Sequence, residues 1–144
     1  MVIYFRGIEG EFGFLSNFAS FEMLLDGKKW ATVEHYFQAQ KFFGSEYAEQ
    51  IRLANTPAEA KKLGRSRTHP LREDWEEVKE DIMRKAVYQK FYTHKDILNK
   101  LLATGDEELV ENAPWDYYWG SGKDGTGKNR LGIILMEIRE KLRN

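Results

Sequence analysis

No cysteine occurs among the 144 residues, which excludes disulfides and thiolate metal sites and favours a reducing compartment. Proline is rare, with three residues, and no repeat or low-complexity tract marks a linker, so we expect a single domain over residues 1–144. The sequence also lacks a long apolar run and a basic leader, which predicts a cytoplasmic protein without a membrane partner. The formal net charge of −1 excludes strong attraction of the whole chain to a polyanion.

Metal ligands are scarce as well. The three histidines, His35, His69 and His94, stand at spacings that match no zinc pattern, and cysteine is absent. We therefore expect neither a metal nor a cofactor. His35 is explained more simply as a hydrogen-bonded packing residue than as a catalytic one.

What the sequence does contain is typical of a small protein with its own core. Hydrophobic residues make up 42% and aromatic residues 14%. Strands are expected at Val2–Phe5 and Leu109–Val110, and Asp26-Gly27 between two short runs predicts a hairpin. Capping residues and hydrophobic periodicity predict helices after Thr32 (to about Phe43), Thr56, Asp74 and Asn129, and around Ile97–Leu102. The predicted fold class is therefore α+β, a mostly helical single domain with a small antiparallel sheet.

Three polar residues recur on one face of the helix expected after Thr32. Glu34, Gln38 and Lys41 stand at i, i+4 and i+7, which stacks them over two turns. A carboxylate, an amide and an ammonium on one face offer an acid or base, a hydrogen-bonding group and an amine nucleophile. The alternative is a solvated polar face, but the other flank is apolar and the helix is short, so we expect most of it to be buried. That apolar flank consists of Val33, Tyr36, Phe37, Phe42 and Phe43.

Two loops carry patterns that suit anion binding. Residues 61–72 hold five lysines and arginines, and Arg65 and Arg67 are natural phosphate ligands. A basic loop that only balances the acidic run after it is an equal alternative. Residues 122–129 nearly match a P-loop, but Asn129 replaces the magnesium-binding Ser or Thr and no hydrophobic strand precedes the loop, so we exclude a nucleoside triphosphatase. This loop either holds an anion on its backbone N–H groups or simply turns the chain into the last helix.

The segment Trp115–Gly120 packs four aromatic residues around one acid. Such rings with an embedded carboxylate suit a pocket for a base or a sugar, in which the rings stack and the acid accepts hydrogen bonds. Aromatic residues that merely pack at the edge of the core are the alternative. The segment alone leaves both interpretations open.

Several segments form a distinctive pattern that runs from about residue 3 to residue 143. They are 14–18 (FLSNF), 30–42 (WATVEHYFQAQKF), 64–65 (GR), 75–79 (WEEVK), 116–122 (DYYWGSG) and 127–132 (GKNRLG), with Leu135-Met136 and Arg139. Together they resemble the NADAR superfamily, and within it the N-glycosidases that act on early intermediates of riboflavin synthesis.

The resemblance implies a compact α+β fold and hydrolysis of the bond between ribose C1 and an exocyclic amine of a nucleobase-like ring. Known members cleave phosphoribosylamino-pyrimidines, and others remove ADP-ribose from guanine. By the family pattern, Glu34, Trp75 and Asp116 fall on catalytic positions. Lys41 falls on a lysine proposed to form a Schiff base with ring-opened ribose.

This division of roles is chemically coherent. An acid such as Glu34 is needed because an amine leaves poorly unless it is protonated, and Asp116 could stabilise the positive charge that develops at C1. Lys41 can trap the C1 aldehyde only if burial keeps part of it neutral, and Trp75 would form a wall of the pocket. The residues expected to bind the phosphorylated ribosyl substrate are Ser16, Asn17, His35, Gln38, Arg65, Trp119, Gly120 and Asn129.

Two other functions compete with this hypothesis. One is removal of ADP-ribose from guanine in nucleic acid; the small net charge speaks against long duplex contacts but not against a flipped base. The other is a module that binds ADP-ribose or a nucleotide without turnover, and the presence of both Glu34 and Lys41 argues against it. Neither the oligomeric state nor the physiological substrate follows from the sequence.

Overall fold

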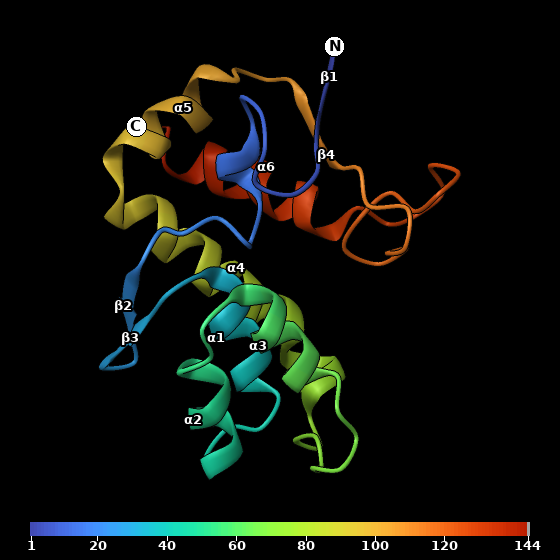
Figure 1. The fold of residues 1–144 in the computed structure, drawn as a ribbon. Helices are drawn as coiled ribbons and strands as arrows, with labels where there is room; N and C mark the ends of the chain where they lie inside the picture. The colour runs from blue at the N-terminus through green and yellow to red at the C-terminus, as the bar shows by residue number, and fades with distance from the viewer. Residues whose placement is uncertain (144) are drawn as a thin grey trace. The chain divides into compact units, whose positions relative to one another are not determined.

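The computed structural model describes residues 1–143 and confirms the α+β class. Within these residues, six helices accompany four short strands, which form one parallel pair and one antiparallel hairpin. The backbone divides into two compact units, one made of residues 1–19 and the described residues from 91 onward, the other of residues 20–90. Figure 1 shows the first unit in dark blue and orange to red, and the second in lighter blue through green to yellow. That residues 1–144 form a single domain stays a prediction.

The elements follow one another along the chain as labelled in Figure 1. The strands are β1 (Val2–Phe5), β2 (Met23–Leu25), β3 (Lys28–Trp30) and β4 (Glu108–Glu111), and a 3-10 turn spans Gly13–Leu15. The helices are α1 (Val33–Gln40), α2 (Glu46–Arg52), α3 (Pro57–Gly64), α4 (Trp75–Thr93), α5 (Lys95–Ala103) and α6 (Arg130–Lys141). Among residues 1–143, no helix is long and apolar enough to cross a membrane.

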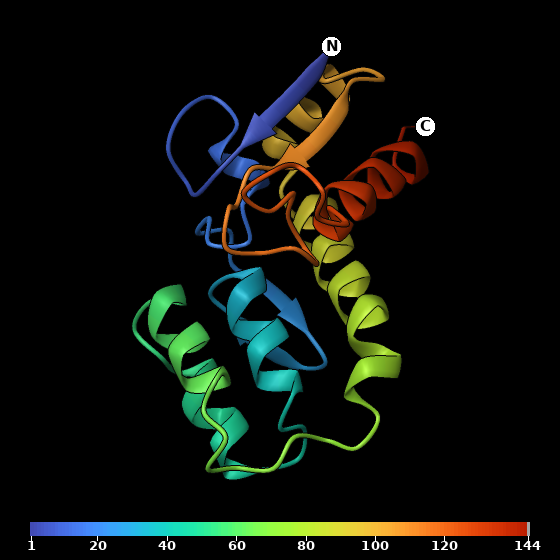
Figure 2. The same ribbon diagram turned by 90° about the vertical axis from the view of Figure 1, so that its right-hand side faces the viewer.

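The first unit is organised around the pairing of β1 with β4. The two strands run parallel with Val2 opposite Glu108 and Phe5 opposite Glu111, and Figure 2 shows the two arrows side by side. The helix α6 packs against β4. This approach requires Gly132, because a Cβ there would lie 2.1 Å from the carbonyl oxygen of Leu109.

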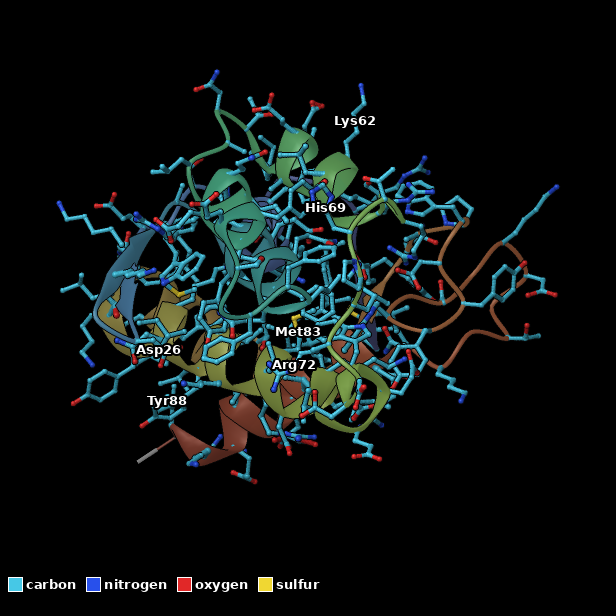
Figure 3. All side chains as sticks on the ribbon, turned by 90° about the horizontal axis from the view of Figure 1, so that it is seen from below. Asp26, Lys62, His69, Arg72, Met83 and Tyr88 are labelled. Atoms are coloured by element: carbon cyan, nitrogen blue, oxygen red, sulfur yellow. The ribbon has the colours of Figure 1, made fainter. Side chains whose placement is uncertain are left out.

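The second unit begins with the predicted hairpin, which the structure confirms. Asp26 and Gly27 have φ angles of 56° and 78°, and a tight hairpin turn of this kind requires positive φ at both positions. The Asp26 carboxylate accepts hydrogen bonds from the Tyr36 hydroxyl at 2.6 Å and from the Lys85 ammonium at 2.7 Å. These bonds tie the hairpin, whose Asp26 is labelled in Figure 3, to α1 and α4.

The helices α1, α2 and α3 pack on one another within this unit, as Figure 1 shows. Each begins with a hydroxyl cap, since Thr32, Ser45 and Thr56 each accept a hydrogen bond from the backbone N–H three residues later. At α3 the Glu59 carboxylate also accepts from the N–H of Asn55, the residue before the cap, at 2.9 Å. The caps of α1 and α3 confirm the sequence prediction for these helices.

Three features of the backbone depart from the prediction. The helix expected to reach Phe43 ends at Gln40, and the Phe43 side chain is 68% exposed rather than part of an apolar flank. The helix α2 was not foreseen, because its seven residues contribute only Tyr47 and Ile51 to the interior. The β1–β4 pair is parallel and joins distant segments, whereas the predicted sheet was antiparallel; only the hairpin fits that description.

Asn129 occupies the expected position before α6, but its side chain does not cap that helix. Its backbone is left-handed, with φ at 50°. The side-chain Oδ1 accepts from the N–H of Glu111 at 3.0 Å, and Nδ2 donates to the carbonyl of Leu109 at 2.9 Å. The expected side-chain cap is therefore wrong, because both polar atoms of the amide are engaged by the backbone of β4.

The caps of α1 and α3 give a matched test of this description. Replacing Thr56 by Ala removes one exposed cap, so we expect a loss of about 1 kcal/mol in the free energy of unfolding. Replacing Thr32 by Ala also removes the hydroxyl that pairs with the buried Nδ1 of His35, so we expect a loss of about 2–4 kcal/mol. Urea unfolding of both variants measures the difference, and equal losses would contradict the coupling of Thr32 to His35.

Candidate active site

The helix α1 is buried on all sides although half of its residues are polar. All eight residues from Val33 to Gln40 are buried, and the side chains of Glu34 and Lys41 are only 7% and 8% exposed. Charged residues are almost never buried to this extent unless a function or a partner requires it. A solvated polar face is therefore excluded for this helix.

Glu34 and Gln38 form a hydrogen-bonded pair inside the second unit. The side-chain Nε2 of Gln38 donates to Oε2 of Glu34 at 2.7 Å, as the i, i+4 spacing allows. The other amide atom, Oε1 of Gln38, has no hydrogen-bond partner among the described residues. It lies against Gly64 of α3, where a Cβ would approach it to 2.0 Å. The amide is thus held between the carboxylate of Glu34 and the backbone of α3.

Lys41 caps the C-terminal end of α1 and points at the end of α3. Its Nζ donates to the carbonyl of Gly64 at 3.5 Å and lies 5.9 Å from the ring centres of both Phe37 and Trp75. The pKa of Lys41 is lowered from 10.5 to about 8, first by burial and next by the positive charge of Arg67, while the charge of Glu34 opposes the change. At neutral pH the Lys41 amine is therefore uncharged in about a tenth of the protein molecules.

Trp75 opens α4 and forms one wall beside the Lys41 amine. The indole is buried and meets the Phe37 ring edge to face at 5.0 Å, with an angle of 61° between the rings. Phe37 was expected on the apolar flank away from the polar stripe. It instead lies beside Lys41, four residues later in the sequence, so that both rings surround the amine with apolar surface.

His35 has the environment of a packing residue. Its Nε2 pairs with the carbonyl of Ala54 at 3.0 Å and its Nδ1 with the hydroxyl of Thr32 at 2.8 Å. A carbonyl only accepts, so Nε2 of the ring carries a proton. Burial lowers the pKa of His35, which favours the neutral ring. Both nitrogens are engaged by the protein, which favours packing over substrate binding.

The basic segment after α3 lies next to Lys41. Arg65 is the C-terminal cap residue of α3 and its side chain is exposed, while Nη1 of Arg67 donates to the carbonyls of Gly64 at 3.3 Å and of Ser66 at 3.1 Å. Figure 3 shows Lys62 extending away from α3 and His69 on the segment that follows. The position of Arg65 suits a phosphate contact, and its binding role stays a prediction.

Asp116 belongs to the first unit and is half-buried. Its Oδ1 accepts the backbone N–H groups of Tyr118 at 3.0 Å and Trp119 at 2.8 Å, which fixes the carboxylate in a turn. The Trp119 ring meets Tyr118 edge to face at 4.9 Å, whereas Trp115 is 61% exposed beneath Arg6. Tyr118 and Trp119 therefore pack on each other, and Trp115 lies against Arg6.

The glycine-rich loop before α6 turns the chain and leaves no free anion cradle at the helix start. The N–H groups of Asn129, Arg130 and Leu131 donate to the carbonyls of Gly120, Tyr118 and Trp119, at 2.9, 3.0 and 3.1 Å. These are the groups that an anion at a helix N-terminus would need. Of the two interpretations of the loop, the structure favours the turn.

Comparison with known proteins decides the family. A family model described as the NADAR domain matches residues 4–143. The chain belongs to the NADAR family. It is 50% identical to the N-glycosidase YbiA of Escherichia coli over 141 residues, covering 98% of this chain and 88% of that protein. The NMR structure of YbiA superposes with a TM-score of 0.91 at 49% identity, covering 99% of this chain and 84% of that chain.

Two other relatives are named for an activity or for a pathway. An N-glycosidase of Nostoc punctiforme is 52% identical over 100% of this chain and 94% of its own length. A riboflavin biosynthesis protein of Vibrio vulnificus is 41% identical over 97% of this chain, which spans 38% of that protein. This NADAR protein is thus a hydrolase that cleaves N-glycosidic bonds.

Within the NADAR fold, four predicted site residues come together in the second unit: Glu34, Gln38, Lys41 and Trp75. The remaining candidates of the first unit are Ser16, Asn17, Asp116, Trp119, Gly120 and Asn129. Ser16 and Asn17 are buried, and Ser16 Oγ accepts from the N–H of Phe18 at 3.1 Å. Sequence reasoning missed Phe37 and Gly64, although the first could have been recognised from its spacing of four residues from Lys41.

The low pKa of Lys41 predicts that this residue weakens the fold. Below about pH 8 the charged side chain is buried, and this cost disappears between pH 8 and pH 10.5, where the unfolded chain holds the proton and the folded protein does not. Replacing Lys41 by Met should therefore raise the free energy of unfolding at pH 7 by about 1–3 kcal/mol. The gain should shrink steadily as the pH rises toward 10.5.

Urea unfolding at several pH values measures this gain. The matched control is Lys62→Met, an exposed lysine of α3, which should change stability by less than about 0.5 kcal/mol. A destabilised Lys41→Met variant, or a gain that does not depend on pH, would contradict the assignment of a buried amine with a lowered pKa.

Proposed function

We propose that this NADAR N-glycosidase hydrolyses phosphoribosylamino-pyrimidine intermediates of riboflavin synthesis, cleaving the bond between ribose C1 and the exocyclic amine. The observation that carries the proposal is a pair of buried groups, the carboxylate of Glu34 on α1 and the amine of Lys41 at the C-terminal cap of α1, whose pKa is about 8. The relative of Vibrio vulnificus that is named for riboflavin biosynthesis supports the choice of substrate.

Glu34 supplies the proton for the leaving group. The exocyclic nitrogen would depart as a poor, anionic leaving group unless a proton reaches it as the C1–N bond breaks. The hydrogen bond from Gln38 to Oε2 fixes the orientation of the Glu34 carboxyl group. In this scheme the Glu34 carboxyl group gives up a proton during the cleavage and regains one when water adds to the imine.

Lys41 supplies the nucleophile. When the ribose ring opens, Glu34 passes a proton to O4′ and C1 becomes double-bonded to the exocyclic nitrogen as an iminium. The neutral Lys41 amine adds to C1, and the Glu34 carboxylate moves a proton from Nζ to the exocyclic nitrogen. The neutral pyrimidine amine then leaves, and a protonated imine remains between Nζ and C1. Water then adds to this imine, which releases ribose 5-phosphate and restores the free amine. The sum of the steps consumes one water and no other reactant.

The remaining candidates bind and orient the substrate in this proposal. Trp75 provides an apolar wall that excludes water from the amine, which keeps part of Lys41 neutral. Arg65 contacts the 5-phosphate through its exposed guanidinium. Asp116 lies in the first unit, where two backbone N–H groups hold its carboxylate, and the catalytic position that the family pattern assigns to it stays a prediction.

The proposal is tested by supplying substrates to the purified protein and measuring the released products. A phosphoribosylamino-pyrimidine should release ribose 5-phosphate, and ADP-ribosylated guanosine should release ADP-ribose far more slowly. Faster turnover of the guanosine substrate would replace the proposed substrate with the ADP-ribosyl one.

The same assay tests Glu34. The variant Glu34→Gln keeps the shape of the side chain but cannot supply the proton, so kcat should fall by about 10²–10⁴-fold with the fold preserved. The matched control is Glu59→Gln, an exposed residue of α3, which should retain nearly full activity. A Glu34→Gln variant of normal rate would remove Glu34 from the mechanism.

A further inference from the structure

Two cations share one acceptor at the end of α3. The carbonyl of Gly64 receives hydrogen bonds from Nζ of Lys41 at 3.5 Å and from Nη1 of Arg67 at 3.3 Å. A second bond from Arg67 to the carbonyl of Ser66 at 3.1 Å fixes the guanidinium there. A guanidinium keeps its proton at any working pH, whereas an amine can lose it. Where the two positive charges meet, Lys41 is therefore the group that becomes neutral.

The last carbonyls of a helix lack partners within the helix, which leaves the Gly64 oxygen available to both side chains. The close approach of α3 to α1 depends on glycine at this position, because a Cβ on residue 64 would lie 2.0 Å from Oε1 and 2.9 Å from Cβ of Gln38. Any side chain there would force the two helices apart and would move the shared carbonyl away from Lys41.

Some of the other groups that face Lys41 in the second unit lower its pKa, and one raises it. Burial lowers the pKa of Lys41 most, and Arg67 has the largest effect among the neighbouring charges. Arg65 and Lys61 lower the pKa further by smaller amounts, and the carboxylate of Glu34 raises it. The rings of Phe37 and Trp75 contact the amine but carry no charge.

We propose that Arg67 is a positioning residue that holds Lys41 in its uncharged, nucleophilic form by sharing the Gly64 carbonyl with it. This inference rests on the proposed role of Lys41 as the nucleophile. It also separates the tasks of the two neighbouring arginines. The Arg65 guanidinium makes no hydrogen bond among the described residues and is available to a phosphate, whereas the Arg67 guanidinium is directed at the carbonyl that Lys41 uses.

The titration of Lys41 measures this effect directly and needs no substrate. In protein made with ¹³C,¹⁵N-labelled lysine, the Cε and Nζ signals of Lys41 are assigned by their loss in the Lys41→Arg variant and followed from pH 6 to pH 11. In Arg67→Ala the midpoint for Lys41 should rise by about half a pH unit to one pH unit, since one positive neighbour is lost. Arg67→Lys keeps the charge and should restore a large part of the difference.

Two further variants fix the sign and the specificity of the shift. Glu34→Gln removes the negative neighbour of Lys41, so it should move the midpoint in the opposite direction. Lys62→Ala removes an exposed positive charge of α3 whose side chain extends away from that helix in Figure 3. This variant should leave the Lys41 midpoint unchanged. Arg67→Gln repeats the test with a polar side chain in case Arg67→Ala does not fold.

An unchanged Lys41 midpoint in Arg67→Ala and Arg67→Gln, or a shift as large in Lys62→Ala, would overturn the inference. The titration tests the role of Arg67, and the hydrolysis of the pyrimidine substrate tests the proposed function. Because the two are measured separately, either one can be contradicted while the other holds. In the hydrolysis assay, the acid limb of the pH profile of kcat/KM should move upward in Arg67→Ala by the same amount as the NMR midpoint. Arg67→Lys should return it toward the original pH.

Discussion

The candidate site depends on removing one amine, that of Lys41, from water. Burial and the charge of Arg67 bring its pKa to about 8, so that an uncharged fraction exists at neutral pH. The surrounding residues all affect this one group: Phe37 and Trp75 give it apolar walls, and Gly64 gives it an acceptor. Burial of this cation lowers the stability of the fold, but it also provides a reactive amine. Functional sites often combine these two effects.

The burial of α1 follows from the helices packed around it. The helices α2 and α3 and the hairpin strand β3 all contact α1, which leaves a helix rich in polar side chains without a solvated face. Oε1 of Gln38 finds no hydrogen-bond partner within residues 1–143, and a buried acceptor without a partner destabilises a fold by about 1–3 kcal/mol. This cost and the hydrogen bond from Gln38 to Glu34 together indicate that the Gln38 amide serves to orient the Glu34 carboxylate.

The features that could be predicted from the sequence are those that depend on residues close together in the chain. Asp26-Gly27 requires a tight turn, Thr32 and Thr56 cap their helices, and the spacing of Glu34, Gln38 and Lys41 places them on one face. Features that depend on distant contacts could not be predicted. The parallel pairing of β1 with β4, the bonds of Asn129 to β4 and the closeness of Gly64 to Gln38 all join segments far apart in the chain. The pKa of Lys41 belongs to this second group, since it is set by burial and by neighbours on α3 and the segment after it.

The central claim is that Lys41 attacks C1 as an amine, and trapping the imine tests it most directly. Sodium borohydride added during turnover of a phosphoribosylamino-pyrimidine should reduce the imine to a stable amine. Intact-mass and peptide mass spectrometry should then find one ribose 5-phosphate adduct, located on Lys41. The Lys41→Arg variant should be inactive and form no adduct, because a guanidinium stays protonated at any working pH. An active Lys41→Arg variant, together with no trapped adduct in the unmodified protein, would contradict the account.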